Sequence, residues 1–233
     1  MLTQPQSVIA VVPAAGVGSR MKADRPKQYL TINGKTILEH TVEKLLAHPQ
    51  VSQIVVAISD DDPYYPELPL TQNLQVIRVV GGSERADSVL SALDYIEKQQ
   101  LGGWVMVHDA ARPCVQLSDI DKLISTAMSH DVGAILAAPV RDTMKRGAQG
   151  QIDHTVERAD LWHALTPQMF RAEPLWNVLS EALQQGVSIT DEASAFEWKG
   201  FSPALVAGRS DNFKITQPED LALAEFYLSQ NKE

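Results

Sequence analysis

Cysteine, long apolar runs and positive charge are all scarce in this sequence, and each scarcity excludes a class of protein. A single cysteine, Cys114, among 233 residues leaves no internal disulfide framework and suits a reducing compartment. No segment has the roughly 20 consecutive apolar residues of a membrane-spanning helix, and the first apolar run is too short for a secretory signal. We therefore expect a soluble cytoplasmic protein with no membrane partner.

Positive charge is also scarce. The chain has 20 Lys and Arg residues against 29 Asp and Glu, which gives a formal net charge of −9 at pH 7. A surface that binds nucleic acid or an anionic membrane needs a cationic footprint, so we expect neither partner. An anionic small molecule would have to be met by a few cations placed locally.

Two common glycine motifs of nucleotide-binding proteins are incomplete or missing. The run from Gly16 to Met21 begins like the dinucleotide fingerprint G-x-G-x-x-G, but Met21 stands where the third glycine allows close helix packing. A clear acid for the ribose is also missing, and the chain has no P-loop with Gly-Lys followed by Ser or Thr. A nicotinamide-dependent dehydrogenase and a P-loop nucleotidase are therefore disfavoured.

The most informative segment that is present runs from Val8 to Lys27. Residues 8–12 are unbroken apolar residues, typical of a strand buried on both faces of a parallel sheet, and Pro13 ends the run. Cations follow at Arg20 and Lys27, so the segment predicts a loop that handles phosphate. A structural turn that uses small residues only for packing is the alternative. The small residues, whose backbone N–H groups a ligand can approach, are Ala14, Ala15, Gly16 and Gly18.

Strand and helix patterns alternate along the rest of the chain. This alternation predicts right-handed crossovers and an α/β three-layer sandwich with a mostly parallel sheet, and 44% hydrophobic residues suffice for one domain over 1–233. We expect helix caps at Ser118 with Asp121, and at Thr216 with Glu219. The predicted strands are 8–12, 54–58, 76–80, 104–107, 133–140 and 204–206, and the predicted helices begin near 37, 86, 118, 174, 191 and 217.

Residues 141–160 interrupt this alternation with a polar two-stranded excursion around a glycine turn. An isolated hairpin this polar has little stability of its own. Two interpretations stay open at this point, a flexible hairpin, which the pattern alone favours, and an arm that packs on a second subunit.

Polar residues follow several of the predicted strands, at the sheet edge where α/β proteins bind ligands. Gly81 and Gly82 form a turn before a helix start. Asp109 follows a buried strand and could hold a divalent ion or substrate hydroxyls, with a salt bridge to Arg112 as the structural alternative. Thr190 to Ser194 has the pattern of a helix cap, and an exposed position is the usual explanation for Lys214.

Taken together, these clusters resemble the 2-C-methyl-D-erythritol 4-phosphate cytidylyltransferase family. The resemblance runs in order from residue 8 to about residue 228. The segments that carry it are Pro13 to Met21, Pro26 to Tyr29, Gly81 to Ser88, His108 to Pro113, Ala138 to Thr143, Thr166 to Gln168 and Thr190 to Glu192.

The resemblance implies that CTP and methylerythritol phosphate are joined, with release of pyrophosphate, in the non-mevalonate route to isoprenoid precursors. It also implies Mg²⁺ as the cofactor, with other divalent ions possible, and a Rossmann-like or GT-A-like sheet. A homodimer is implied as well, in which a protruding β-arm at 139–160 completes the partner's site. This last point reverses the preference for a flexible hairpin.

The resemblance also implies a role for each candidate residue. Arg20 and Lys27 would stabilise the triphosphate and the transition state, while Lys214 and Arg158 would hold the incoming phosphate, Arg158 from the partner's arm. Asp109 would contact substrate and ribose hydroxyls, which is the role we favour, with Mg²⁺ binding as the alternative. The expected nucleotide-binding residues are Ala14, Ala15, Gly16, Gly18, Gly82 and Ser88; those expected around the second substrate are Thr143, Thr166, Thr190 and Asp191, and Arg112 is a further substrate-binding candidate.

Two alternatives to this reaction remain at the level of the sequence. One is a cytidylyltransferase for another polyol phosphate, such as ribitol 5-phosphate, because such an enzyme would share the nucleotide loop. The other is a nucleotide-binding regulator without catalysis, which the joint presence of Arg20, Lys27 and Lys214 disfavours.

Replacing Lys27 tests the expected role of the loop. We predict that Lys27→Ala lowers turnover at least ~10²-fold, because one preorganised positive charge is lost from the transition state. Pyrophosphate release from CTP and methylerythritol phosphate is the measurement, and near-normal turnover in a folded variant would refute the assignment.

Overall fold

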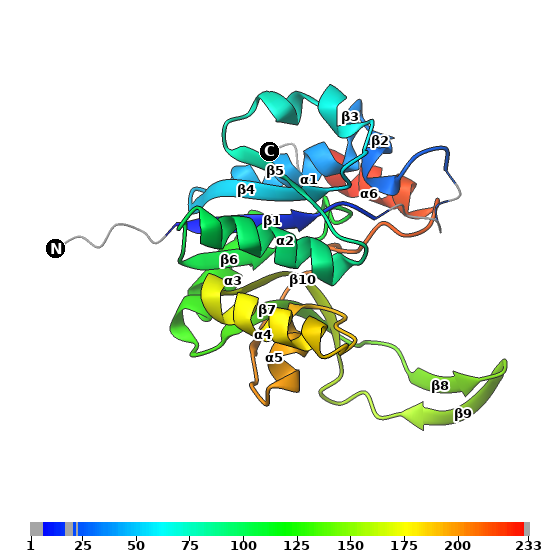
Figure 1. The fold of residues 1–233 in the computed structure, drawn as a ribbon. Coiled ribbons are helices and arrows are strands. Elements are labelled where there is room, and N and C mark those ends of the chain that lie inside the picture. The colour runs from blue at the N-terminus through cyan, green and yellow to red at the C-terminus, as the bar shows by residue number, and fades with distance from the viewer. Residues whose placement is uncertain (1–6, 17–20, 22, 231–233) are drawn as a thin grey trace.

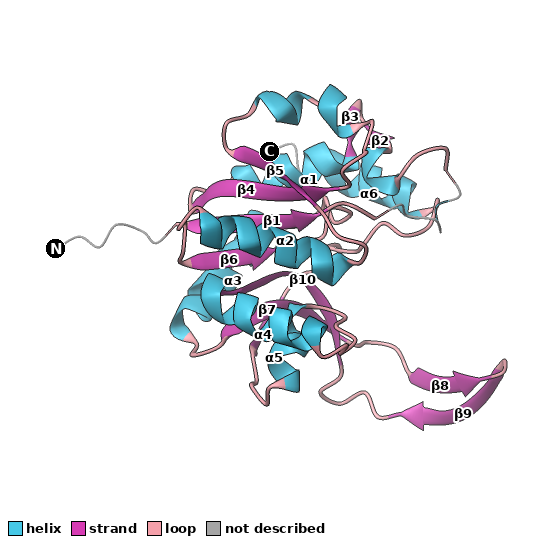
Figure 2. Cartoon of the chain, in the orientation of Figure 1, coloured by secondary structure: helices cyan, strands magenta, loops and turns pink. Residues whose placement is uncertain are grey.

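The computed structural model describes residues 7–16, 21 and 23–230, and within them the core is a seven-stranded sheet flanked by helices (Figure 1, Figure 2). The strand order is β11-β7-β10-β6-β1-β4-β5, and β10 alone among these described strands runs antiparallel to its neighbours. The prediction of a mostly parallel α/β sheet is confirmed. The strands are β1 Val8–Pro13, β4 Val51–Ile58, β5 Val76–Val80, β6 Trp104–Val107, β7 Gly133–Pro139, β10 Trp162–Arg171 and β11 Ala204–Ala207.

Two helical layers bury the two faces of this sheet. Along β1, Val8, Ala10 and Val12 join the core beneath α1 and α3, whereas Ile9 and Val11 join the core beneath α2, α4 and α5. This alternation explains why the strand reads as an unbroken apolar run, since each side chain of β1 has a hydrophobic layer to enter. The helices are α1 Ile37–Leu46, α2 Arg85–Lys98, α3 Leu117–Ser129, α4 Ala172–Gln184, α5 Glu192–Trp198 and α6 Asp220–Gln230.

The segment between β1 and β4 places the chain beside the sheet edge. A short 3-10 helix, η2 (Lys27–Tyr29), precedes strands β2 (Thr31–Ile32) and β3 (Lys35–Thr36). Asn33 and Gly34 join the two strands with φ of 51° and 80°, as a tight two-residue hairpin requires. Within the 59–73 loop the structure has two further 3-10 helices, η3 (Tyr65–Glu67) and η4 (Pro69–Gln72).

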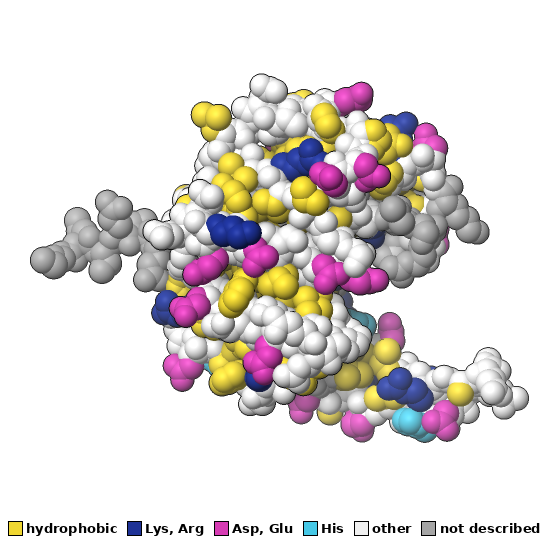
Figure 3. All heavy atoms as spheres, in the orientation of Figure 1, with side chains coloured by type: hydrophobic (Ala, Val, Ile, Leu, Met, Phe, Trp, Pro, Cys, Tyr) yellow, Lys and Arg dark blue, Asp and Glu magenta, His cyan; other side chains and the backbone are white. Residues whose placement is uncertain are grey.

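The predicted two-stranded excursion is a hairpin of β8 (Met144–Ala148) and β9 (Gln151–Val156). Gln149 and Gly150 form its turn with φ of 51° and 78°. The hairpin lies apart from the body of the chain and carries charged side chains of both signs (Figure 1, Figure 3). Its apolar residues Met144 and Ile152 are exposed, so this hairpin has no hydrophobic core of its own.

Three sequence predictions need correction. Strand β10 was missed, because Pro167 and the polar residues around it break the apolar pattern of a central strand. Helix α3 begins at Leu117 after Gln116 and has no side-chain cap, so the expected cap at Ser118 is wrong. Helix α6 begins at Asp220, whose own carboxylate accepts the Thr216 and Gln217 N–H groups, so the expected Thr216 and Glu219 pair is wrong too.

No helix in the described part of the chain is both long and apolar enough to cross a lipid bilayer.

Candidate active site

A pocket of about 310 Å³ opens at the carboxyl ends of β1 and β6, beside the turn that follows β5. This is the edge where a mostly parallel sheet is expected to bind ligands. Eight of the predicted site residues line it, from five separate segments of the chain. They are Ala14, Ala15, Gly16, Lys27, Gly82, Ser88, Asp109 and Lys214.

Gln28 organises the loop that follows β1. Its side-chain amide donates to the carbonyls of Ala14 and Gly16, at 2.7 and 3.1 Å, and Ser59 Oγ donates to the carbonyl of Ala15 between them. Three consecutive carbonyls therefore face side-chain donors. The Ala14 N–H donates to Ala57 in β4, whereas the Ala15 N–H makes no hydrogen bond to the described residues and can serve a ligand.

The turn after β5 leads directly into α2. Ser88 Oγ accepts a hydrogen bond from the Gly82 N–H at 3.1 Å, and the Asp87 carboxylate accepts from Ser83 and from the Glu84 N–H. A Cβ on Gly82 would lie 2.2 Å from Asp87 Cβ, which no side chain tolerates. Glycine is therefore required here by the close packing of the turn on the helix.

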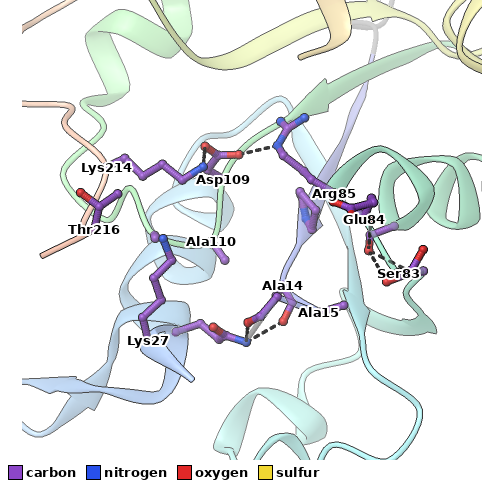
Figure 4. A pocket seen from close by; sticks show the side chains of 16 residues that line it. Ala14, Ala15, Lys27, Ser83, Glu84, Arg85, Asp109, Ala110, Lys214 and Thr216 are labelled. Carbon is purple, nitrogen blue, oxygen red and sulfur yellow. Dashed lines mark hydrogen bonds and ion pairs between the residues drawn. The ribbon is translucent and has the colours of Figure 1, made fainter. Parts of the chain in front are cut away.

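Asp109 is the charged centre of the pocket. Arg85 Nε lies 2.9 Å from its Oδ1, Lys214 Nζ lies 2.8 Å from its Oδ2, and Arg112 Nε lies 3.6 Å from Oδ2. Figure 4 shows Lys214 and Arg85 reaching the carboxylate from opposite sides. The salt bridge to Arg112, which was the structural alternative to a functional role, is present, but Arg85 and Lys214 make the shorter contacts.

These cations decide the ionisation of Asp109. Burial raises its pKa, but the charges of Arg85, Lys214 and Arg112 outweigh burial and hold the pKa well below its ordinary value. For Arg85, burial lowers the pKa, while Glu192 and Asp109 together raise it above its ordinary value. The pocket thus contains a carboxylate, Asp109, and a guanidinium, Arg85, that are both charged at neutral pH.

A neutral histidine supports the backbone beneath Asp109. Burial lowers the pKa of His108 to about 4. Its Nε2 lies 3.0 Å from the Arg112 carbonyl and must donate, so its Nδ1 accepts from Thr166 Oγ1 at 3.1 Å. The same Thr166 oxygen accepts the Asp109 N–H. Thr166 is therefore buried behind Asp109 and does not line the pocket.

Lys27 of η2 lines the pocket and contacts the segment before α6. Its Nζ donates to the Ile215 carbonyl at 3.0 Å, and the Ile215 N–H in turn donates to Ala111. This segment also carries Lys214 and Thr216, which line the pocket beside Lys27 (Figure 4). Two of the predicted catalytic cations are thereby held on one short stretch of backbone.

The pocket lining does not include five of the other predicted residues, which are Arg112, Thr143, Arg158, Thr190 and Asp191. Arg112 donates to the Asn212 carbonyl, and Asp191 caps α5 as the pattern had indicated. Thr190 is exposed, as are Thr143 and Arg158 on either side of the β8–β9 hairpin. Their substrate contacts stay predictions, and Gly18 and Arg20 lie outside the described residues.

Sequence reasoning missed Arg85 and Glu192 as parts of the site. Arg85 Nη1 and Nη2 lie 2.7 and 3.1 Å from the two carboxylate oxygens of Glu192. Both residues stand at helix starts, where capping explains a polar residue, so neither position alone indicated a pair 107 residues apart. Gln28 was missed as well, because a glutamine beside a lysine carries no distinctive signal.

The described residues include no group of three or more His, Cys, Asp or Glu placed to hold a metal ion. Asp109, the metal-ligand candidate predicted from the sequence, would supply a single carboxylate.

The Gln28 contacts generate a prediction for the loop. Gln28→Glu would set a carboxylate against two carbonyls, so we expect the affinity for CTP to fall at least about 10-fold. Gln184→Glu makes the same chemical change at an exposed position on α4 and should bind CTP normally. Calorimetric titration of both folded variants is the measurement, and equal affinities would contradict the role of Gln28.

Comparison with known proteins agrees with this geometry. The family model described as 2-C-methyl-D-erythritol 4-phosphate cytidylyltransferase matches residues 8–230. A protein of that name from Vibrio atlanticus (strain LGP32) is 91% identical over 233 residues, which is 100% of both chains.

Solved structures give the same result. The crystal structure of a 4-diphosphocytidyl-2C-methyl-D-erythritol synthase has a TM-score of 0.85 and 37% identity, covering 97% of this chain and 100% of its own. That of the Francisella tularensis 2-C-methyl-D-erythritol 4-phosphate cytidylyltransferase has a TM-score of 0.82 and 33% identity, covering 95% and 100%. The chain therefore belongs to the 2-C-methyl-D-erythritol 4-phosphate cytidylyltransferase family.

Proposed function

We propose that this protein joins CTP to 2-C-methyl-D-erythritol 4-phosphate, giving 4-diphosphocytidyl-2-C-methyl-D-erythritol and pyrophosphate, with Mg²⁺, as a cytoplasmic homodimer. The family match over residues 8–230 supports the reaction. The observation that carries the proposal is the pocket that joins the β1 loop, Lys27, Lys214 and the ionised Asp109. The lone, buried Cys114, whose pKa burial raises to about 12, suits a reducing compartment.

The reaction requires two anions to approach each other. A phosphate oxygen of methylerythritol phosphate attacks the α-phosphorus of CTP in line, and the bond from that phosphorus to the pyrophosphate oxygen breaks. Such transfers rely on positioning and on charge stabilisation rather than on covalent help from the protein. Lys27 and Lys214, held on the same stretch of backbone, would hold the triphosphate and the incoming phosphate together.

The nucleoside end of CTP would lie against the loop and the turn. Ala15 offers a backbone N–H that the described residues do not use, and Gly82 and Ser88 line the same pocket. Asp109 is ionised and lines the same pocket, so its oxygens can accept hydrogen bonds from ribose hydroxyls.

The donor chemistry of the pocket fits a Mg²⁺ ion that CTP carries. Mg²⁺ commonly binds one or two carboxylates together with substrate phosphates and several waters, rather than a cage built by the protein. Asp109 would supply such a carboxylate from the pocket wall, as the alternative to its contact with ribose hydroxyls. When bound, the ion would offset negative charge on the phosphates.

The exposed hairpin supports the dimer in this proposal. Thr143 and Arg158 flank β8 and β9, outside the pocket of their own chain. The hairpin also exposes Met144 and Ile152, which a second subunit would cover. Each arm would thus bring Thr143 and Arg158 to the methylerythritol phosphate end of the partner's pocket.

A panel of acceptors tests the reaction. With CTP and Mg²⁺, we expect pyrophosphate release with methylerythritol phosphate and at least about 10²-fold less with ribitol 5-phosphate, whose chain differs at groups that the site would bind. Faster release with ribitol 5-phosphate would reassign the acceptor. CTP binding without turnover on any acceptor would favour a regulator.

Subunit mixing tests the shared site. Lys27→Ala and Arg158→Ala homodimers should both be inactive, whereas a heterodimer of the two keeps one pocket with an intact Lys27 and an intact partner Arg158. Activity near half of wild type is expected, since one of two sites is complete. The measurement is pyrophosphate release by purified, differently tagged heterodimers, and no recovery would contradict the exchange of arms.

A further inference from the structure

Glu192 is a buried acid that the reaction as proposed does not use. Its side chain is 2% exposed and it does not line the pocket, yet it binds both terminal nitrogens of Arg85. A bidentate pair between guanidinium and carboxylate fixes both distance and orientation. The pair therefore determines where the third nitrogen of Arg85, Nε, points.

That third nitrogen reaches Asp109. Arg85 Nε lies 2.9 Å from Oδ1, which leaves Oδ2 for Lys214 at 2.8 Å. With its terminal nitrogens occupied by Glu192, Arg85 can offer Asp109 only Nε, so it cannot take both oxygens of that carboxylate. Glu192 thus limits Arg85 to one oxygen and keeps the other available for Lys214.

Glu192 itself is held in a fixed place at the start of α5. Gln168 in β10 donates to the Asp191 carboxylate at 2.8 Å and accepts the Ala193 N–H at 3.0 Å. These two contacts attach the residues on either side of Glu192 to the sheet. A continuous set of contacts therefore runs from β10 through α5 and Arg85 to Asp109.

We propose that Glu192 is a positioning residue, which orients the Asp109 carboxylate toward the nucleotide by restraining Arg85, an inference that rests on the proposed function. When Glu192 loses its charge, Arg85 is free to form a bidentate contact with both oxygens of Asp109. Its contact with Oδ2 then competes with that of Lys214. The affinity for CTP then falls even though Glu192 touches no part of the pocket.

Glu192→Gln keeps the size of the side chain and removes its charge. We expect the dissociation constant for CTP, measured by calorimetric titration, to rise about 10-fold. Glu197→Gln is the matched control, because Glu197 lies exposed on the same helix, and it should bind CTP as the wild type does. Unchanged affinity in a folded Glu192→Gln protein would overturn the proposal.

The Asp109→Asn background separates positioning from a general structural role. If Glu192 acts through Asp109, adding Glu192→Gln to Asp109→Asn should change CTP affinity less than about 2-fold. The full 10-fold loss in that background would contradict the proposal, because Glu192 would then act on the pocket by another route.

A charge-retaining variant separates the effect of the lost charge from a general disturbance of the fold. Glu192→Asp keeps the carboxylate and should lose less CTP affinity than Glu192→Gln, while an equal loss would count against the role of the charge. Thermal unfolding of each protein establishes that it is folded. Wild-type protein that binds CTP but shows no turnover on any acceptor would contradict the proposed function and leave this proposal intact.

Discussion

The arrangement of this site depends on keeping one carboxylate ionised where water scarcely reaches it. Asp109 is 8% exposed, and in an apolar setting its burial alone would favour the protonated acid. Among the described residues, Arg85, Lys214 and Arg112 supply the compensating charge, and each comes from a different segment. The turn after β5, the loop after β6 and the segment before α6 must therefore fold together before the site exists.

A layer of buried polar side chains lies behind the pocket and holds the backbone around Asp109 in place. His108, Thr166 and Asn212 are all buried, and their hydrogen bonds connect the loop after β6 to β10 and to the 211–215 segment. Buried polar groups are costly unless they are paired, and here nearly every group has a partner. Small displacements of this layer would leave several groups unpaired at once, which favours a single geometry.

Much of the sheet could be predicted because its central parallel strands are buried on both faces and read as apolar runs, as in Val8 to Val12 and Trp104 to Val107. Strand β10 could not be predicted, because Thr166, Pro167 and Gln168 interrupt the apolar pattern of its sequence. Local motifs located Lys27, Asp109 and Lys214, but the partnership of Arg85 with Glu192 depends on tertiary structure. The cap of α6 was misplaced because Asp220, rather than Glu219, accepts the Thr216 and Gln217 N–H groups, and α3 begins without a side-chain cap.

The reversed direction of β10 has a consequence for the hairpin. Strand β7 ends, and β10 begins, at the edge of the sheet that carries the pocket, so the connection between them must leave the body on that side. The connection crosses no layer and supports no core, and lengthening a surface loop twofold costs only about 0.6 kcal/mol in closure entropy. The hairpin can therefore extend far from the body of the chain without disturbing the sheet or the charged pocket.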